Sequence, residues 1–168
     1  MFLKKILEWK REEIKRKLAH RPCDSLLVEV GDRGRRHIKS LATAVRIPGP
    51  SIVAEIKRAS PSKGILAPGL SVGAMADLYD KNGAAAISVL TDERYFQGRL
   101  ADLRVVRAVT KLPLLRKDFI IDPYQIIETK WAGADAVLLI MAALSRTQAG
   151  ELRSCARELG LEVLAEVH

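Results

Sequence analysis

The sequence has few of the residues that bind metals or form disulfides. Among its 168 residues are two cysteines, Cys23 and Cys155, which lie far apart and form no CxxC motif. The three histidines, His20, His37 and His168, are also scattered along the chain. Structural zinc sites need closely spaced Cys and His ligands, and a disulfide framework needs several paired cysteines. The sequence therefore predicts no metal site and no disulfide.

Long hydrophobic runs are absent as well. No run approaches the roughly 20 apolar residues that cross a membrane as a helix. Lys4, Lys5, Glu8 and Lys10 interrupt the N-terminal segment, which is unlike a signal peptide. The length and the 48% content of hydrophobic residues match one globular domain with a substantial core. We expect a cytoplasmic protein that makes no contact with a membrane.

Aromatic residues make up only 5% of the chain, and its positive charge is unevenly distributed. Residues 1–48 carry a net charge of +7, whereas residues 49–168 carry +1. A basic segment can bind nucleic acid, but here acidic residues are interspersed and no aromatic cluster is available to stack on bases. We therefore predict no nucleic-acid partner and expect the basic segment to attract an anionic substrate.

The chain divides into two regions with different patterns. In residues 2–19 apolar side chains recur near helical spacing, which predicts an amphipathic helix. Residues 21–50 contain several Pro and Gly residues and are expected to be irregular, apart from a short helix at 36–45. We expect the N-terminal helix and linker, residues 1–48, to pack on a main body formed by residues 49–168.

The main body alternates short apolar segments with helical ones. The expected strands are 52–57, 86–90, 113–117, 136–140 and 162–167, and the expected helices are 71–82, 100–109, 123–132 and 147–159. Such alternation is typical of an α/β fold with a parallel sheet. Five strands are too few for an eight-stranded barrel. The pattern therefore leaves two architectures open, an open doubly wound sheet or a (β/α)₈ barrel truncated after the fifth strand.

Capping residues support these helix boundaries. Ser71 and Asp122 are suited to cap helix N-termini, because their side-chain oxygens can accept hydrogen bonds from the first-turn amides. Gly83, Gly133 and Gly160 each follow a helical segment closely. Glycine is the residue most often found just beyond a helix C-terminus, so each should end its helix before the next strand.

Two charged side chains interrupt the first strand. Glu55 and Lys57 are two residues apart, so both project to the same face. Charges inside an apolar strand are tolerated when they form an ion pair or serve a function, and this pattern alone leaves both readings open. The following loop, residues 60–64, combines hydroxyl groups, a lysine and a glycine, which suits an anionic ligand beyond the strand end.

Further charged residues close other strands, where ligands of parallel α/β proteins bind. Lys117 ends the third strand and Glu166 lies in the fifth. Together with Glu55 and Lys57, they predict a cluster of acids and bases. A desolvated lysine can donate a proton, and a poorly hydrated glutamate can accept one. For Lys117 alone, an ion pair with Asp118 or with a more distant carboxylate is the alternative.

Two phenylalanines lie close to these positions in the sequence. Phe96 follows the second strand and Phe119 follows the third. As isolated residues they are typical of ordinary core packing. At the rim of a charged cluster, they are instead suited to stack on an aromatic substrate.

Several segments resemble the indole-3-glycerol phosphate synthase family. They are SIVAEIKRASPSKG (51–64), AAAISVLTDERYFQG (84–98), PLLRKDFIIDPYQI (113–126), GADAVLLI (133–140), LEVLAEVH (161–168) and, less distinctively, ILEWKREEIKRKL (6–18). The resemblance implies a (β/α)₈ barrel enzyme that needs no cofactor or metal. The implied reaction converts 1-(2-carboxyphenylamino)-1-deoxyribulose 5-phosphate to indole-3-glycerol phosphate, with release of carbon dioxide and water.

The resemblance also implies roles for the charged residues. Lys117 is the implied general acid at the substrate carbonyl during ring closure, and Glu166 is implied to act as a base or acid in later proton transfers. Glu55 and Lys57 are implied to contact the substrate and to take part in dehydration.

The implied substrate is an anionic, phosphorylated small molecule. By the same resemblance, Ser60 helps to bind its phosphate. Phe96, Phe119 and Leu138 form the pocket for its anthranilate ring.

The family pattern continues beyond the fifth strand, where its phosphate loops after strands seven and eight have no counterpart in this sequence. We therefore expect little activity from these 168 residues alone. Exposed sheet edges are expected to drive self-association or binding of a complementing C-terminal fragment. The alternatives are a noncatalytic partial barrel that acts as a binding or association module, and an unrelated barrel enzyme for another sugar phosphate.

Overall fold

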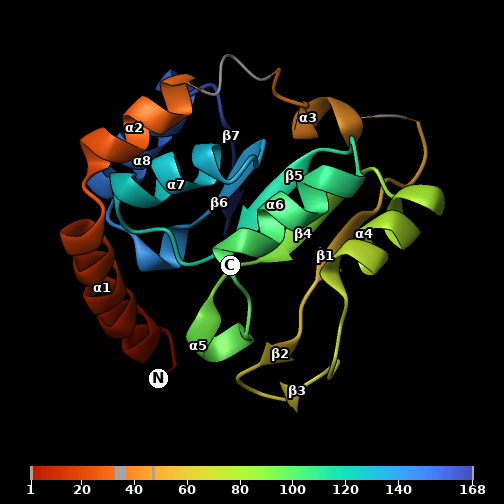
Figure 1. The fold of residues 1–168 in the computed structure, drawn as a ribbon, viewed down its shortest axis with the longest axis horizontal. Helices are drawn as coiled ribbons and strands as arrows, with labels where there is room; N and C mark the ends of the chain where they lie inside the picture. Colours follow the sequence, from red (N-terminus) through yellow and green to blue (C-terminus); the bar gives the residue numbers. More distant parts are fainter. Residues whose placement is uncertain (1, 33–36, 47, 168) are drawn as a thin grey trace.

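Five parallel strands form the centre of the fold (Figure 1). A computed structural model describes residues 2–32, 37–46 and 48–167; Arg36, where the short helix was expected to begin, and His168 lie outside these ranges. The sheet has the order β1-β4-β5-β6-β7. Its strands are β1 (Val53–Ile56), β4 (Ala86–Leu90), β5 (Leu114–Lys117), β6 (Ala136–Ile140) and β7 (Glu162–Glu166). All five expected strands are thereby confirmed, to within one residue at each end.

Four helices connect these strands, and three of them begin at N-caps formed by a side chain. They are α4 (Val72–Lys81), α6 (Leu100–Val109), α7 (Pro123–Trp131) and α8 (Arg146–Glu158). The hydroxyl of Ser71 accepts from the amide of Ala74, and the carboxylate of Asp122 accepts from that of Tyr124. The expected caps are therefore confirmed, and the glycines at positions 83, 133 and 160 adopt the left-handed φ angles expected beyond helix C-termini.

Shorter elements complete the fold. A two-stranded antiparallel hairpin, β2 (Ala59–Ser60) and β3 (Gly64–Ile65), follows β1. The four-residue helix α5 (Glu93–Phe96) follows β4, and the 3₁₀ helix η1 (Met141–Ala143) follows β6. The hairpin and α5 lie together at the lower edge of Figure 1, which is the carboxyl end of the strands.

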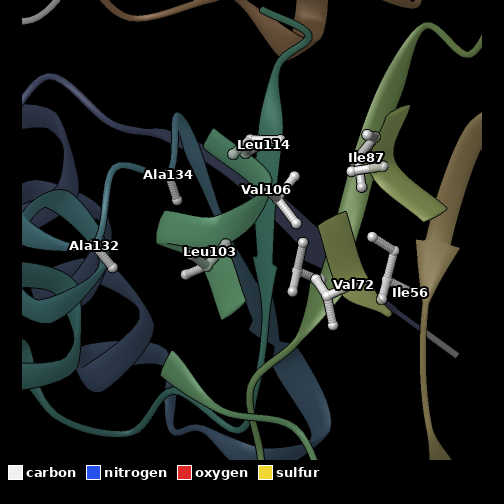
Figure 2. Close-up of a cluster of buried hydrophobic side chains, with 10 residues drawn as sticks. Ile56, Val72, Ile87, Leu103, Val106, Leu114, Ala132 and Ala134 are labelled. Atoms are coloured by element: carbon white, nitrogen blue, oxygen red, sulfur yellow. The ribbon is translucent and has the colours of Figure 1, made fainter. Parts of the chain in front are cut away.

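All four connecting helices pack on the same face of the sheet. Paired residues of neighbouring strands face the same side, and the register pairs Ile87 with Leu114 and Arg116 with Val137. Figure 2 shows Ile87 and Leu114 packed with Leu103 of α6 in one buried cluster. Val137 packs with residues of α7 and α8 in a second cluster. Helices on one face are typical of a (β/α) barrel, whereas a doubly wound sheet has helices on both.

The N-terminal region is more regular than expected. Helix α1 (Phe2–His20) confirms the expected amphipathic helix, but α2 (Cys23–Asp32) lies in the segment that was expected to be irregular. That expectation was wrong because Pro22 precedes the helix and Gly31 lies in its last turn, where neither interrupts the helix interior. Leu26 is fully buried against α7 next to Ile127, while Leu27 and Val28 are exposed. Within the expected 36–45 helix, only α3 (Leu41–Ala44) is helical.

The segment around α3 closes the amino end of the strands, at the upper edge of Figure 1. Leu41 packs with Ala86, Leu115 and Ala136 on the inner face of the sheet, the face without the connecting helices. The carboxylate of Glu162 accepts from the hydroxyl of Ser40 at 2.6 Å. Backbone and side-chain contacts thus fix the segment to the start of the sheet. None of the helices in the described parts of the chain combines the length and the hydropathy of a membrane span.

Asp135 joins this segment to the rest of the fold. Its fully buried carboxylate accepts from the amides of Lys39 and Leu114, each at 2.9 Å, and pairs with Arg107 of α6 at 2.8 Å. Removing one member of a buried ion pair leaves the other groups without compensation.

Replacing Asp135 should therefore be far more damaging than replacing a surface carboxylate. We expect Asp135→Ala to lower the free energy of unfolding by about 3–5 kcal/mol, measured by chemical denaturation. The control is Asp77→Ala, because Asp77 forms an ion pair with Lys81 on the surface of α4. Its loss should cost about 1 kcal/mol or less. Equal losses for the two variants would contradict this role of Asp135.

Candidate active site

The carboxyl ends of the strands bring the predicted charged residues to one edge of the sheet. Lys117 and Glu166 are the last residues of β5 and β7, and Lys57 directly follows β1. In the register, Leu90 pairs with Lys117, and Ile140 pairs with Glu166. Because the strands are parallel, all of these residues lie at the same end.

A cavity of about 350 Å³ opens at this end, which we call the strand-end pocket. Such a volume suits a small organic ligand. Its charged lining consists of Glu55, Lys57, Lys117, Asp118 and Glu166, and its apolar lining consists of Leu3, Leu90, Phe96, Phe119, Leu138, Ile140 and Ala142. The pocket thus combines acids and bases with an aromatic wall.

Glu55 links the two lysines of the pocket. Its carboxylate oxygens lie 2.5 Å from Nζ of Lys57 and 2.8 Å from Nζ of Lys117. All three side chains are partly exposed, between 27% and 37%. Burial alone raises the pKa of Glu55, but hydrogen bonds and charges from Lys117 and Lys57 together hold this pKa below its usual value. Glu55 is therefore ionised at neutral pH and balances the charge of the two lysines.

The distant carboxylate that pairs with Lys117 is thus Glu55, and Asp118 is not its partner. Adjacent strand residues face opposite sides, so Lys117 points into the pocket, whereas Asp118 pairs with Arg116 toward the helices. Glu166 lines the same pocket from β7. The structure therefore brings together the four charged residues predicted from the sequence.

The two phenylalanines form one wall of the strand-end pocket. The ring centroids of Phe96 and Phe119 lie 6.1 Å apart, with an angle of 39° between the ring planes. Leu138 of β6 also lines the pocket. The loop after α5 is tightly folded, since a Cβ atom at Gly98 would lie 2.1 Å from the carbonyl oxygen of Leu90. This close approach helps to fix the position of Phe96.

Ser60 lies apart from the lining of this pocket. It belongs to the β2–β3 hairpin, where its hydroxyl accepts from the amide of Lys63 at 3.3 Å. The preceding Arg58 pairs with Asp102 of α6, which anchors the hairpin beside the pocket. The part of Ser60 in phosphate binding stays a prediction.

A network of largely buried charges lies behind the pocket. It was not predicted from the sequence. We call it the charge ring; it consists of Lys10, Asp118, Arg116, Glu128, Lys17 and Glu13, with successive members 2.8–3.3 Å apart. It joins α1, β5 and α7. The ring alternates cations and anions, so every buried charge has partners of opposite sign on both sides.

Within the ring, Asp118 and Arg116 are almost completely buried. Burial alone raises the pKa of Asp118, but the charges of Lys10 and Arg116 and a hydrogen bond from Thr91 hold this pKa well below its usual range.

A signal for part of this network was present in the sequence. Lys10 lies midway between Ile6 and Ile14 at four-residue spacing, so a charge falls on the buried stripe of α1.

A family model described as "Indole-3-glycerol phosphate synthase" matches residues 3–168. Curated proteins with this name from Syntrophobacter fumaroxidans, Burkholderia multivorans and Burkholderia vietnamiensis are 44%, 46% and 44% identical to the chain over 99% of its length. The chain spans 63% of the length of the first protein and 64% of the other two.

The lowered pKa of Asp118 makes stability depend on pH in a defined direction. A carboxylate with a depressed pKa in the folded state stabilises fully above its unfolded pKa of about 4, and this contribution is lost as the pH falls further. We therefore expect the free energy of unfolding to fall as the pH is lowered below about 4.

Asp118→Asn should start from a lower stability at neutral pH and lose less of it on acidification. Urea denaturation at a series of pH values measures how the free energy of unfolding changes with pH in the parent and in the variant. An unchanged slope in the variant would show that Asp118 carries no such pH dependence.

Proposed function

This chain belongs to the indole-3-glycerol phosphate synthase family, and we propose that its strand-end pocket closes the indole ring. The substrate is 1-(2-carboxyphenylamino)-1-deoxyribulose 5-phosphate, and the products are indole-3-glycerol phosphate, carbon dioxide and water. The main support is that Glu55, Lys57, Lys117 and Glu166 line one pocket beside two phenylalanines. Ring closure needs proton donors and acceptors next to an aromatic binding surface.

Lys117 is the proposed proton donor in the first step. The aromatic carbon that carries the carboxylate forms a bond to the carbonyl carbon, and the carbonyl oxygen takes a proton from Nζ of Lys117. Glu55, 2.8 Å from this ammonium group, holds it in place. The positive charge on the ammonium also stabilises the negative charge that develops on the oxygen.

The following steps form no covalent bond between the substrate and the protein. Carbon dioxide leaves because the cationic ring-closed intermediate takes up the electron pair of the broken bond. The new hydroxyl group then leaves as water after protonation, and a base removes a proton from the neighbouring carbon. We assign these two proton transfers to Lys57, Glu55 and Glu166, without dividing them among the three.

Binding of the substrate is proposed to involve two parts of the site. Phe96, Phe119 and Leu138 hold the anthranilate ring, since stacking and apolar contact favour an aromatic group there. Ser60 in the β2–β3 hairpin contributes to the phosphate site.

We also propose that the reaction takes place in the cytoplasm. A phosphorylated, carboxylated substrate is too highly charged to cross a bilayer, so it stays in the compartment where it is made.

A noncatalytic association module is the second candidate function. On the inner face of the sheet, a hollow of about 400 Å³ continues from the strand-end pocket and is lined in part by Val53, Leu164 and Val167. These three side chains are 39–73% exposed. Exposed apolar surface at sheet edges favours association. We propose that a second copy of the chain or a complementing fragment covers this face.

A turnover experiment tests the proposed reaction and shows whether association completes the catalytic site. Indole fluorescence is followed with the 168-residue chain alone, over a range of chain concentrations, and after mixing with a polypeptide equivalent to the last third of one of the two Burkholderia relatives. Turnover that rises more steeply than the chain concentration indicates a second copy, and turnover that appears on mixing indicates a complementing fragment. Absence of indole under all of these conditions would contradict the proposed reaction.

Where turnover is found, Lys117→Met should lower kcat by roughly 10²- to 10⁴-fold, because general acid catalysis contributes about that much. The matched control is Lys111→Met, since Lys111 is exposed in the turn before β5. This variant should retain the parent rate. A parent-like rate in Lys117→Met would remove Lys117 from the acid role.

A further inference from the structure

Lys10 is a charged residue on the buried side of α1. Its side chain is 1% exposed, and its ammonium group lies between carboxylates of three elements. The distances are 2.8 Å to Glu13 of the same helix, 2.9 Å to Asp92 after β4 and 3.0 Å to Asp118 after β5. One ammonium group therefore joins α1 to the loops that follow two neighbouring strands.

Each of the two loop carboxylates fixes residues of the strand-end pocket. The second oxygen of Asp92 accepts from the amide of Tyr95 at 2.8 Å, and this N-cap begins the short helix α5 that carries Phe96. Asp118 lies between Lys117 and Phe119 in the chain. Its carboxylate also accepts from the amide of Phe119 at 2.8 Å.

The position of α1 supports the same connection. Leu3, near the start of this helix, lines the strand-end pocket. The guanidinium group of Arg94 in α5 lies 3.9 Å from the ring centroid of Trp9, which precedes Lys10. Helix α1 therefore contacts the pocket and α5 directly, and Lys10 lies at the centre of this contact.

We propose that Lys10 is a positioning residue of the candidate active site, an inference that rests on the proposed function. Its ammonium group holds the loops after β4 and β5 in register with one another. Through Asp92 it sets the place of Phe96, and through Asp118 it sets the places of Lys117 and Phe119. Lys10 itself makes no contact with the substrate.

The charges of this connection persist across the neutral pH range. Burial alone lowers the pKa of Lys10, but Asp118, Asp92 and Glu13 together raise it above its usual value. The pKa of Asp118 lies well below its usual range. Lys10 and Asp118 are thus both ionised whenever the protein is folded near neutral pH.

Lys10→Met tests the proposal, because methionine keeps most of the side-chain length and removes the charge. The control is Lys15→Met, since Lys15 is an exposed lysine of the same helix. Amide hydrogen exchange of the 168-residue chains is the first readout. In Lys10→Met we expect exchange at residues 92–98 and 118–121 to rise roughly 10- to 100-fold more than at strand residues 86–90 and 114–116. Lys15→Met should match the parent.

Kinetics provide the second readout, in whichever form of the protein shows turnover. Lys10→Met should lower kcat, because Lys117 is displaced, and raise KM, because the two phenylalanines lose their spacing. The combined loss in kcat/KM should be roughly 10- to 100-fold. A purely structural role would lower the denaturation midpoint and leave both constants unchanged at temperatures where the variant is folded.

The two readouts separate failure of this inference from failure of the proposed function. Loop-specific exchange without any turnover in the parent would support the role of Lys10 and contradict the reaction. Uniform exchange across loops and strands, or parent-like kcat and KM, would overturn the role of Lys10. If Lys10→Met does not fold, Lys10→Gln keeps a hydrogen-bond donor without the charge, and the same comparisons apply to it.

Discussion

The fold and the site both depend on keeping the carboxylate of Asp118 ionised in the interior. An isolated carboxylate there would cost several kcal/mol or take up a proton. Lys10 and Arg116 supply positive charge at 3.0 and 2.9 Å, and Thr91 donates a hydrogen bond at 2.6 Å. These partners come from α1, β5 and the end of β4, so α1 has to lie across the strand ends for the charge to be compensated.

The ion pairs of Asp118 also fix the positions of residues in the strand-end pocket. Strand alternation directs Arg116 toward the helices and Lys117 into the pocket, and Asp118 pairs with Arg116 just after the strand. The buried pair therefore fixes the backbone on both sides of the proposed acid. Glu55 of β1, which is separated from β5 by β4, then holds Lys117 as the carboxylate shared by two ammonium groups.

Much of this arrangement was predictable because it follows from local patterns. The strands and connecting helices follow from apolar alternation and capping residues, and the shared face of Glu55 and Lys57 follows from their two-residue spacing. Positions at the strand ends identified six of the eight candidate site residues, and the family resemblance added Leu138 and the phosphate role of Ser60. Seven of these line the strand-end pocket, while Ser60 lies in the neighbouring hairpin.

Features that depend on distant contacts were not predictable in this way. Helix α2 is stabilised by the packing of Leu26 against α7, and the Pro and Gly residues near its two ends made the segment resemble a loop. The pairing of Lys117 with Glu55 joins residues 62 positions apart, and spacing alone could not select this carboxylate over Asp118. The charge ring combines residues of three elements, so only the stripe position of Lys10 was visible beforehand.

Lys117 and the two phenylalanines are proposed to act on one substrate in the strand-end pocket. The sharpest test is a crystal structure of the chain with a substrate analogue whose carbonyl is reduced to an alcohol, because this analogue cannot close the ring. We expect the anthranilate ring against Phe96 and Phe119, with the alcohol oxygen about 3 Å from Nζ of Lys117. An analogue bound outside the pocket, or one that leaves Lys117 out of contact, would contradict this proposal.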